Sequence, residues 1–107
     1  MTDMAFDAYQ TAAHQTAIYP PENGLQYLVA GLAGEAGEVA GKAAKYFRGD
    51  KELNRDDMVK ELGDVLWFVS ELAFHLGVPL SEIAQGNIRK LAKRKAAGTL
   101  QGDGDNR

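Results

Sequence analysis

Cysteine is absent from the 107 residues of this chain, which excludes disulfide bonds and thiolate ligands to a metal. No apolar run approaches the ~18 residues that a membrane-spanning helix needs. The first ten residues, MTDMAFDAYQ, lack the basic segment and the apolar run of a secretory signal peptide. We therefore expect a cytoplasmic protein that does not associate with a membrane.

The chain also lacks a surplus of positive charge, since 12 Lys and Arg residues stand against 15 Asp and Glu residues and the net charge is -3. A protein that binds nucleic acid through general phosphate attraction needs a basic surplus, so we expect no nucleic-acid partner. A small phosphorylated substrate remains compatible with this charge, because bound metal ions supply the positive charge that phosphates need.

Proline is scarce, and the three prolines, Pro20, Pro21 and Pro79, fall where the apolar periodicity of helices breaks. No alternating pattern of strand length is present. The periodicity predicts a single all-α domain over 1–107, a four-helix bundle with helices at 3–17, 25–47, 55–76 and 80–97. The third helix is the most apolar and is expected at the centre. The polar, glycine-rich tail 98–107 is expected to be mobile or ordered by a ligand or partner.

Two pairs of acids at one spacing are the most informative feature of the chain: Glu35 with Glu38, and Glu61 with Asp64. An i, i+3 spacing places both members of a pair on one side of a helix, one turn apart. Both pairs interrupt apolar lines, formed by Leu28, Leu32 and Val39 in one helix and by Met58, Val65, Phe68 and Leu72 in the other. Carboxylates that face a core are costly unless compensated, so these acids predict a site for divalent cations.

Four glycines, Gly31, Gly34, Gly37 and Gly41, lie within the predicted helix 25–47. Together they cost roughly 2–4 kcal/mol of helix stability relative to alanine. A helix that tolerates this cost is expected to need close approach of another backbone or of a ligand near the acids. The alternative is a loop flanked by two short helices.

Surface pairing along the helices is the competing interpretation of the acids. Lys42 follows Glu38 by four residues and Lys60 precedes Asp64 by four, the spacing of stabilising ion pairs on a helix surface. On the residues alone, a metal site and solvated helix faces both remain open. Carboxylate oxygens suit Mg²⁺ or Mn²⁺, and two such ions can hold a phosphate chain and activate water.

The segment GEAGE at 34–38, followed by ELGD at 61–64, resembles the ExxE…ExxD motif of the MazG-like nucleotide pyrophosphohydrolases, members of the all-α nucleoside triphosphate pyrophosphatase superfamily. The resemblance covers the chain from about Tyr9 to Arg107. Further segments that match in order and spacing are 16–20 (TAIYP), 31–32 (GL), 64–67 (DVLW), 87–91 (NIRKL) with Arg94, and 102–107 (GDGDNR).

The resemblance implies cleavage of a nucleoside triphosphate between its α- and β-phosphates, giving a monophosphate and pyrophosphate. It implies that the catalytic and metal-binding residues are Glu35, Glu38, Glu61 and Asp64, with Mg²⁺ as the cofactor and Mn²⁺ as a possible substitute. Some family members carry an extra acid where this chain has Gly34. The general base is therefore open, and one of the four acids, such as Glu38 or Glu35, is expected to orient the attacking water.

Contacts to the nucleotide are implied for Asn87 and Lys90, with Arg94 as a further phosphate contact. Tyr19 and Phe68 are candidates for binding the base, since Phe68 follows Asp64 by one helical turn. A place for Phe68 in the core explains it equally well. Trp67 is expected in the core or at a subunit interface.

Apolar side chains on more than one side of the third helix indicate surface that a single chain of this size leaves exposed. The resemblance implies a homo-oligomer, a dimer or a tetramer, with its sites near or shared across the subunit interface. The competing functional hypothesis is a non-catalytic helical module that binds nucleotides or protein partners. Four inward carboxylates favour the enzyme, because a scaffold has no physical need for them.

Overall fold

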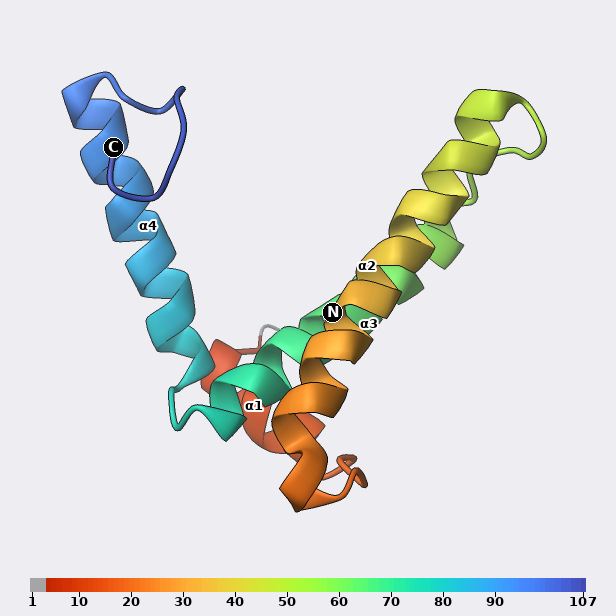
Figure 1. Ribbon diagram of the computed structural model, residues 1–107, viewed down its shortest axis with the longest axis horizontal. Coiled ribbons are helices and arrows are strands. Elements are labelled where there is room, and N and C mark those ends of the chain that lie inside the picture. Colours follow the sequence, from red (N-terminus) through yellow and green to blue (C-terminus); the bar gives the residue numbers. More distant parts are fainter. Residues whose placement is uncertain (1–3) are drawn as a thin grey trace.

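The computed structural model describes residues 4–107 and contains only helices (Figure 1). The elements are α1 (Phe6–His14), the 3₁₀ helix η1 (Pro21–Asn23), α2 (Gly24–Arg48), α3 (Arg55–His75) and α4 (Leu80–Ala97). The all-α prediction is thus confirmed, and α2 is one continuous helix across its four glycines. None of the described helices is long and apolar enough to cross a membrane.

Local signals fix most helix ends. The side chain of Asn54 accepts a hydrogen bond from the amide of Asp57 at 3.1 Å and so caps the start of α3. Gly49, Gly77 and Gly98 follow α2, α3 and α4 with φ of 88°, 74° and 71°, a left-handed conformation that favours glycine at helix ends.

The first helix is shorter than the predicted range 3–17. Residue 3 lies outside the described part of the chain, and the helix ends at His14 rather than at residue 17. The helix ends there because Thr16 closes a turn: its amide and its hydroxyl both donate a hydrogen bond to the carbonyl of Ala13, at 3.0 and 2.7 Å. The indole of Trp67 also donates to that carbonyl and to the Thr16 hydroxyl, at 3.2 and 2.8 Å. Trp67 therefore joins α1 to α3.

Helices α2 and α3 form an antiparallel hairpin, and α3 is the one described helix that contacts α1, α2 and α4 (Figure 1). This confirms α3 as the central helix. Leu28 is fully buried in the α2–α3 seam, and Gly31 lies against the ring of Phe68. The close approach that the glycines predict is therefore present at Gly31, whereas a Cβ at Gly34, Gly37 or Gly41 would meet no atom of this chain within 4 Å.

The start of α4 is held by α1. The carboxylate of Asp7 accepts hydrogen bonds from the amide and the hydroxyl of Ser81, at 2.9 and 2.8 Å. The side-chain oxygen of Gln10 accepts one from the amide of Leu80 at 3.1 Å. These bonds satisfy two of the amide donors that the first turn of a helix leaves without partners.

Beyond its first turns, α4 projects away from the α2–α3 hairpin, so that the molecule is V-shaped (Figure 1). The radius of gyration is 16.5 Å, whereas a compact domain of this length has about 13 Å. Apolar side chains of α4 are exposed as a result, among them Ile88 at 66%. Within one chain, therefore, the four predicted helices are present but α4 does not close a bundle with α2 and α3.

Candidate metal centre

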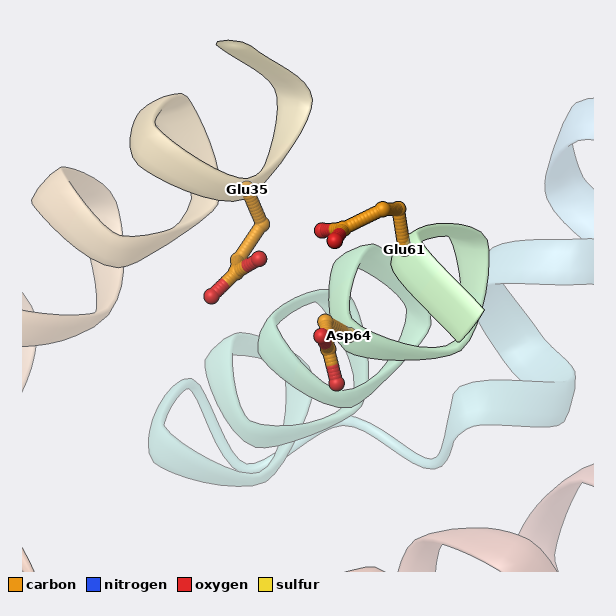
Figure 2. Close-up of side chains that lie close together, drawn as sticks. All are labelled: Glu35, Glu61 and Asp64. Atoms are coloured by element: carbon orange, nitrogen blue, oxygen red, sulfur yellow. The ribbon is translucent and has the colours of Figure 1, made fainter. Parts of the chain in front are cut away.

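Three carboxylates converge between the middle of α2 and the first half of α3 (Figure 2). They belong to Glu35 of α2 and to Glu61 and Asp64 of α3, and one oxygen from each lies within 4.8 Å of the other two. The antiparallel pairing of α2 and α3 brings the two acid motifs to the same level of the hairpin. Glu35 and Glu61 are half-buried, whereas Asp64 is exposed.

Burial and the neighbouring acids both disfavour the charged form of the Glu35 carboxyl. Burial raises the pKa of the Glu35 carboxyl above 4.5, and the negative charges of Asp64, Glu61 and Glu38 raise this pKa further. A divalent cation among the three oxygens would remove that repulsion, because it replaces like-charge contacts with attraction. The donor set, carboxylate oxygens only, fits a hard ion such as Mg²⁺.

Glu38, the fourth acid of the motif, is exposed and lies outside the group of three. Residues three apart on an α-helix differ by about 60° in direction. When Glu35 points at α3, Glu38 therefore points to one side of the α2–α3 seam. Its charge still contributes to the raised pKa of Glu35, and its role as a metal ligand stays a prediction.

Tyr9 of α1 is a neighbour of this centre that the sequence did not single out. Burial raises the pKa of the Tyr9 phenol, and the negative charge of Asp64 raises it further. The phenol is therefore within electrostatic reach of the carboxylates. The sequence indicates for Tyr9 only a place on the apolar side of the first helix, so no pattern marked it as a neighbour of the acids.

Phe68, one turn beyond Asp64, is 8% exposed and packs against Gly31. Its ring is 5.7 Å from that of Tyr27, centroid to centroid, and Tyr27 in turn stacks on Tyr19 at 5.2 Å. Phe68, Tyr27 and Tyr19 therefore form a row of three aromatic rings. The burial of Phe68 accords with a place in the core, and a base contact by Phe68 or Tyr19 stays a prediction.

The hydroxyl of Tyr19 is engaged inside the chain. It donates a hydrogen bond to Oε1 of Glu71 at 2.9 Å, and burial together with Glu71 raises the pKa of Tyr19 to about 12. Glu71 is fully buried, and Nδ1 of His14 hydrogen-bonds both of its oxygens, at 3.1 and 3.2 Å. Glu71 is not among the residues predicted from the sequence, although it follows Asp64 by two helical turns and so lies on the same side of α3.

The nucleotide contacts expected on α4 are not brought to the carboxylates within one chain, because α4 makes no contact with α2 and projects away from the α2–α3 hairpin (Figure 1). Asn87 is exposed, Lys90 is half-buried, and Arg94 is 6% exposed. The side chains of Lys90 and Arg94 instead contact the tail that follows α4. Nζ of Lys90 and Nη2 of Arg94 lie 3.1 and 3.2 Å from Oδ1 of Asp105.

The tail after α4 folds into a loop around two guanidinium groups. Arg94 also donates to the carbonyl of Asp105 at 2.9 Å. Arg107 donates to the carbonyls of Thr99 and Leu100, each at 3.1 Å, and also to that of Gly104. The chain's own arginines therefore hold the tail, where the sequence predicted either mobility or order imposed by a ligand or partner.

Comparison with known proteins places this site in a family context. The chain is 50% identical to the Gene 37 protein of Mycobacterium phage L5 over 115 aligned positions, which take in 97% of this chain and all of the phage protein. No solved structure shows a significant match. Residues 23–98, which include Glu35, Glu38, Glu61 and Asp64, match the model of the MazG nucleotide pyrophosphohydrolase domain. The chain therefore belongs to the MazG nucleotide pyrophosphohydrolase family.

Proposed function

We propose that this protein is a Mg²⁺-dependent nucleoside triphosphate pyrophosphohydrolase, with Mn²⁺ as a possible substitute for Mg²⁺. It cleaves ribo- or deoxyribonucleoside triphosphates between the α- and β-phosphates and releases a nucleoside monophosphate and pyrophosphate. The observation that carries the proposal is the convergence of the Glu35, Glu61 and Asp64 carboxylates from two helices. A scaffold gains nothing from such a cluster, because each like charge there destabilises the fold.

In this proposal the carboxylates act as ligands and as proton acceptors. Bound divalent cations would supply Lewis-acid polarisation of the phosphate oxygens. A carboxylate of the cluster or Glu38 takes a proton from the water that attacks phosphorus, and the bridging oxygen leaves with the pyrophosphate.

The nucleotide contacts require a second copy of the chain. We place the exposed, apolar sides of α2, α3 and α4 in the interface of a homo-oligomer, a dimer or a tetramer. In such an assembly α4 of one copy brings Asn87 and Lys90 to the carboxylates of another. Lys90 is the better candidate for a phosphate contact than Arg94, since Arg94 is buried beneath the tail. Tyr19 and Phe68 remain the candidates for the base.

The test is a product assay with purified protein and Mg²⁺ across the standard ribo- and deoxyribonucleoside triphosphates, in which pyrophosphate and orthophosphate are separated. We expect monophosphate and pyrophosphate in equal amounts. The variant Glu61→Gln should lose the activity, and Glu82→Gln, an exposed acid on α4, should keep it. Orthophosphate with a diphosphate would refute cleavage between α and β, and no product from any nucleotide would favour the non-catalytic module.

A further inference from the structure

A hollow of about 110 Å³ lies where the end of α2, the connection to α3 and the first turn of α3 meet. This is the joined end of the α2–α3 hairpin (Figure 1). The polar side chains that line the hollow are those of Lys42, Lys45, Lys51, Glu52, Asn54 and Asp57. Its volume exceeds that of a single water molecule, which takes up about 30 Å³ in the liquid.

The charged groups of the lining are three ammonium groups and two carboxylates, and one of the three ammonium groups, that of Lys42, pairs with Glu61 outside the hollow. Within residues 4–107, Lys45 and Lys51 form no ion pair, although Glu52 and Asp57 line the same hollow. The ammonium groups of Lys45 and Lys51 therefore remain available to an anion that enters the hollow.

The hollow adjoins the metal centre. Lys42 lines the hollow and its Nζ lies 4.0 Å from Oε1 of Glu61. Asp57, also in the lining, precedes Glu61 by one helical turn, which is about 5.4 Å along the axis. At its nearest edge, therefore, the hollow lies about one turn of α3 from the carboxylate cluster, a span that two linked phosphate groups can bridge.

We propose that this hollow binds the β- and γ-phosphates of the substrate and holds them as the leaving pyrophosphate. The inference rests on the proposed function, and it adds a binding site on the α2–α3 hairpin to the contacts expected from α4. Lys45 and Lys51 neutralise phosphate oxygens that the metal-bound carboxylates do not reach, while Lys42 lies between the hollow and Glu61. Binding here selects triphosphates over monophosphates.

The test compares the double variant Lys45→Gln/Lys51→Gln with a control of equal charge change, Lys93→Gln/Lys95→Gln, whose two lysines lie exposed on α4. The probe is inorganic pyrophosphate in the presence of Mg²⁺, measured as a product inhibitor of triphosphate hydrolysis and by titration calorimetry. We expect the hollow variant to bind pyrophosphate about ten-fold more weakly or worse, since hydrogen bonds to charged groups are lost. Inhibition by the nucleoside monophosphate should not change.

The calorimetric measurement separates this inference from the proposed function, because it needs no turnover. Pyrophosphate binding that depends on Lys45 and Lys51 supports the hollow even if no nucleotide is hydrolysed. Equal pyrophosphate affinity in wild type, hollow variant and control overturns the hollow, whether or not triphosphates are cleaved. Absence of pyrophosphate binding to the wild type overturns it as well. Melting temperatures of all three proteins establish that the variants are folded.

Discussion

Gly31 of α2 lies directly against the ring of Phe68 of α3: a Cβ on Gly31 would stand 2.1 Å from Cε1 of that ring. Each of these two residues is one helical turn from an acid of the candidate metal centre, Gly31 from Glu35 and Phe68 from Asp64. Their contact therefore sets how closely α2 and α3 approach beside the carboxylates, and the geometry of the cluster depends on it.

The first prediction is that Gly31→Ala destabilises the protein by about 1–3 kcal/mol, the usual cost of overpacking, despite the gain in helix propensity. Urea unfolding measures this. Gly34→Ala is the matched control on the same helix, since a Cβ there meets nothing within 4 Å. It should stabilise the helix by about 0.5–1 kcal/mol. Equal stabilisation by both substitutions would show that the Phe68 contact does not constrain the helices.

Metal binding should be detectable without any substrate. Millimolar Mg²⁺ added to chelator-treated protein should raise the melting temperature, because a ligand that binds only the native state stabilises it, by about 2.7 kcal/mol at 100 times its dissociation constant. Glu61→Gln should reduce this response strongly, whereas Glu82→Gln on α4 should leave it intact. An identical response in both variants would remove Glu61 from the metal site.

The raised pKa of Glu35 predicts the sign of a pH effect on the metal-free protein. The folded state holds the Glu35 proton more tightly than the unfolded chain, whose pKa is close to 4.5. Stability therefore falls as the pH rises from about 4.5 through the raised value. Glu35→Gln should remove this component, so that metal-free wild type and variant differ least below pH ~4.5 and the variant is the more stable above it. Melting temperatures from pH 4 to 8 with a chelator present measure the difference.

A Glu35→Gln variant that is less stable than wild type at pH 8 would contradict the unfavourable environment of the Glu35 carboxylate.

The Tyr19–Glu71 hydrogen bond should stabilise the fold independently of catalysis. Tyr19→Phe leaves the fully buried Glu71 without its phenol donor, which should cost about 1–3 kcal/mol. Tyr46→Phe, at an exposed tyrosine on α2, is the control and should cost little. Because the pKa of Tyr19 is about 12, the phenol remains a donor throughout the neutral range. Denaturant unfolding at pH 7 and 9 should therefore show the same difference at both values.

Substitutions of Asp64 and Glu38 test which acids belong to the candidate metal centre. Asp64→Asn removes a member of the converging group, and Glu38→Gln changes the acid outside it. We expect both variants to remain folded and to lose turnover, Asp64→Asn by loss of a ligand and Glu38→Gln by loss of a ligand or proton acceptor. Steady-state hydrolysis and the Mg²⁺-induced melting shift together distinguish these roles. Near-normal turnover in both would refute the assignment of the site.

Helix boundaries and the pairing of acids were accessible from local patterns. Pro79 and Gly98 mark the ends of α4, and Asn54 caps α3, because proline, glycine and short polar side chains act through their own backbone geometry. The i, i+3 spacing likewise places Glu35 beside Glu38 wherever the helix lies. The helices of the fold, and the pairing of the acids within each helix, could therefore be predicted without coordinates.

Packing between helices determined the rotation of α2, the burial of Glu71 and the direction of α4. Whether Glu35 or Glu38 faces α3 depends on the rotation of α2 about its axis, and the contact between Gly31 and Phe68 accompanies the observed rotation. Burial of Glu71 depends on α1, since His14 supplies one of its two hydrogen-bonding partners. The direction of α4 depends on hydrogen bonds from Leu80 and Ser81 to Gln10 and Asp7, some 70 residues away in sequence. Contacts between residues so far apart leave no periodic trace in the chain, so they emerge only when the helices are packed together.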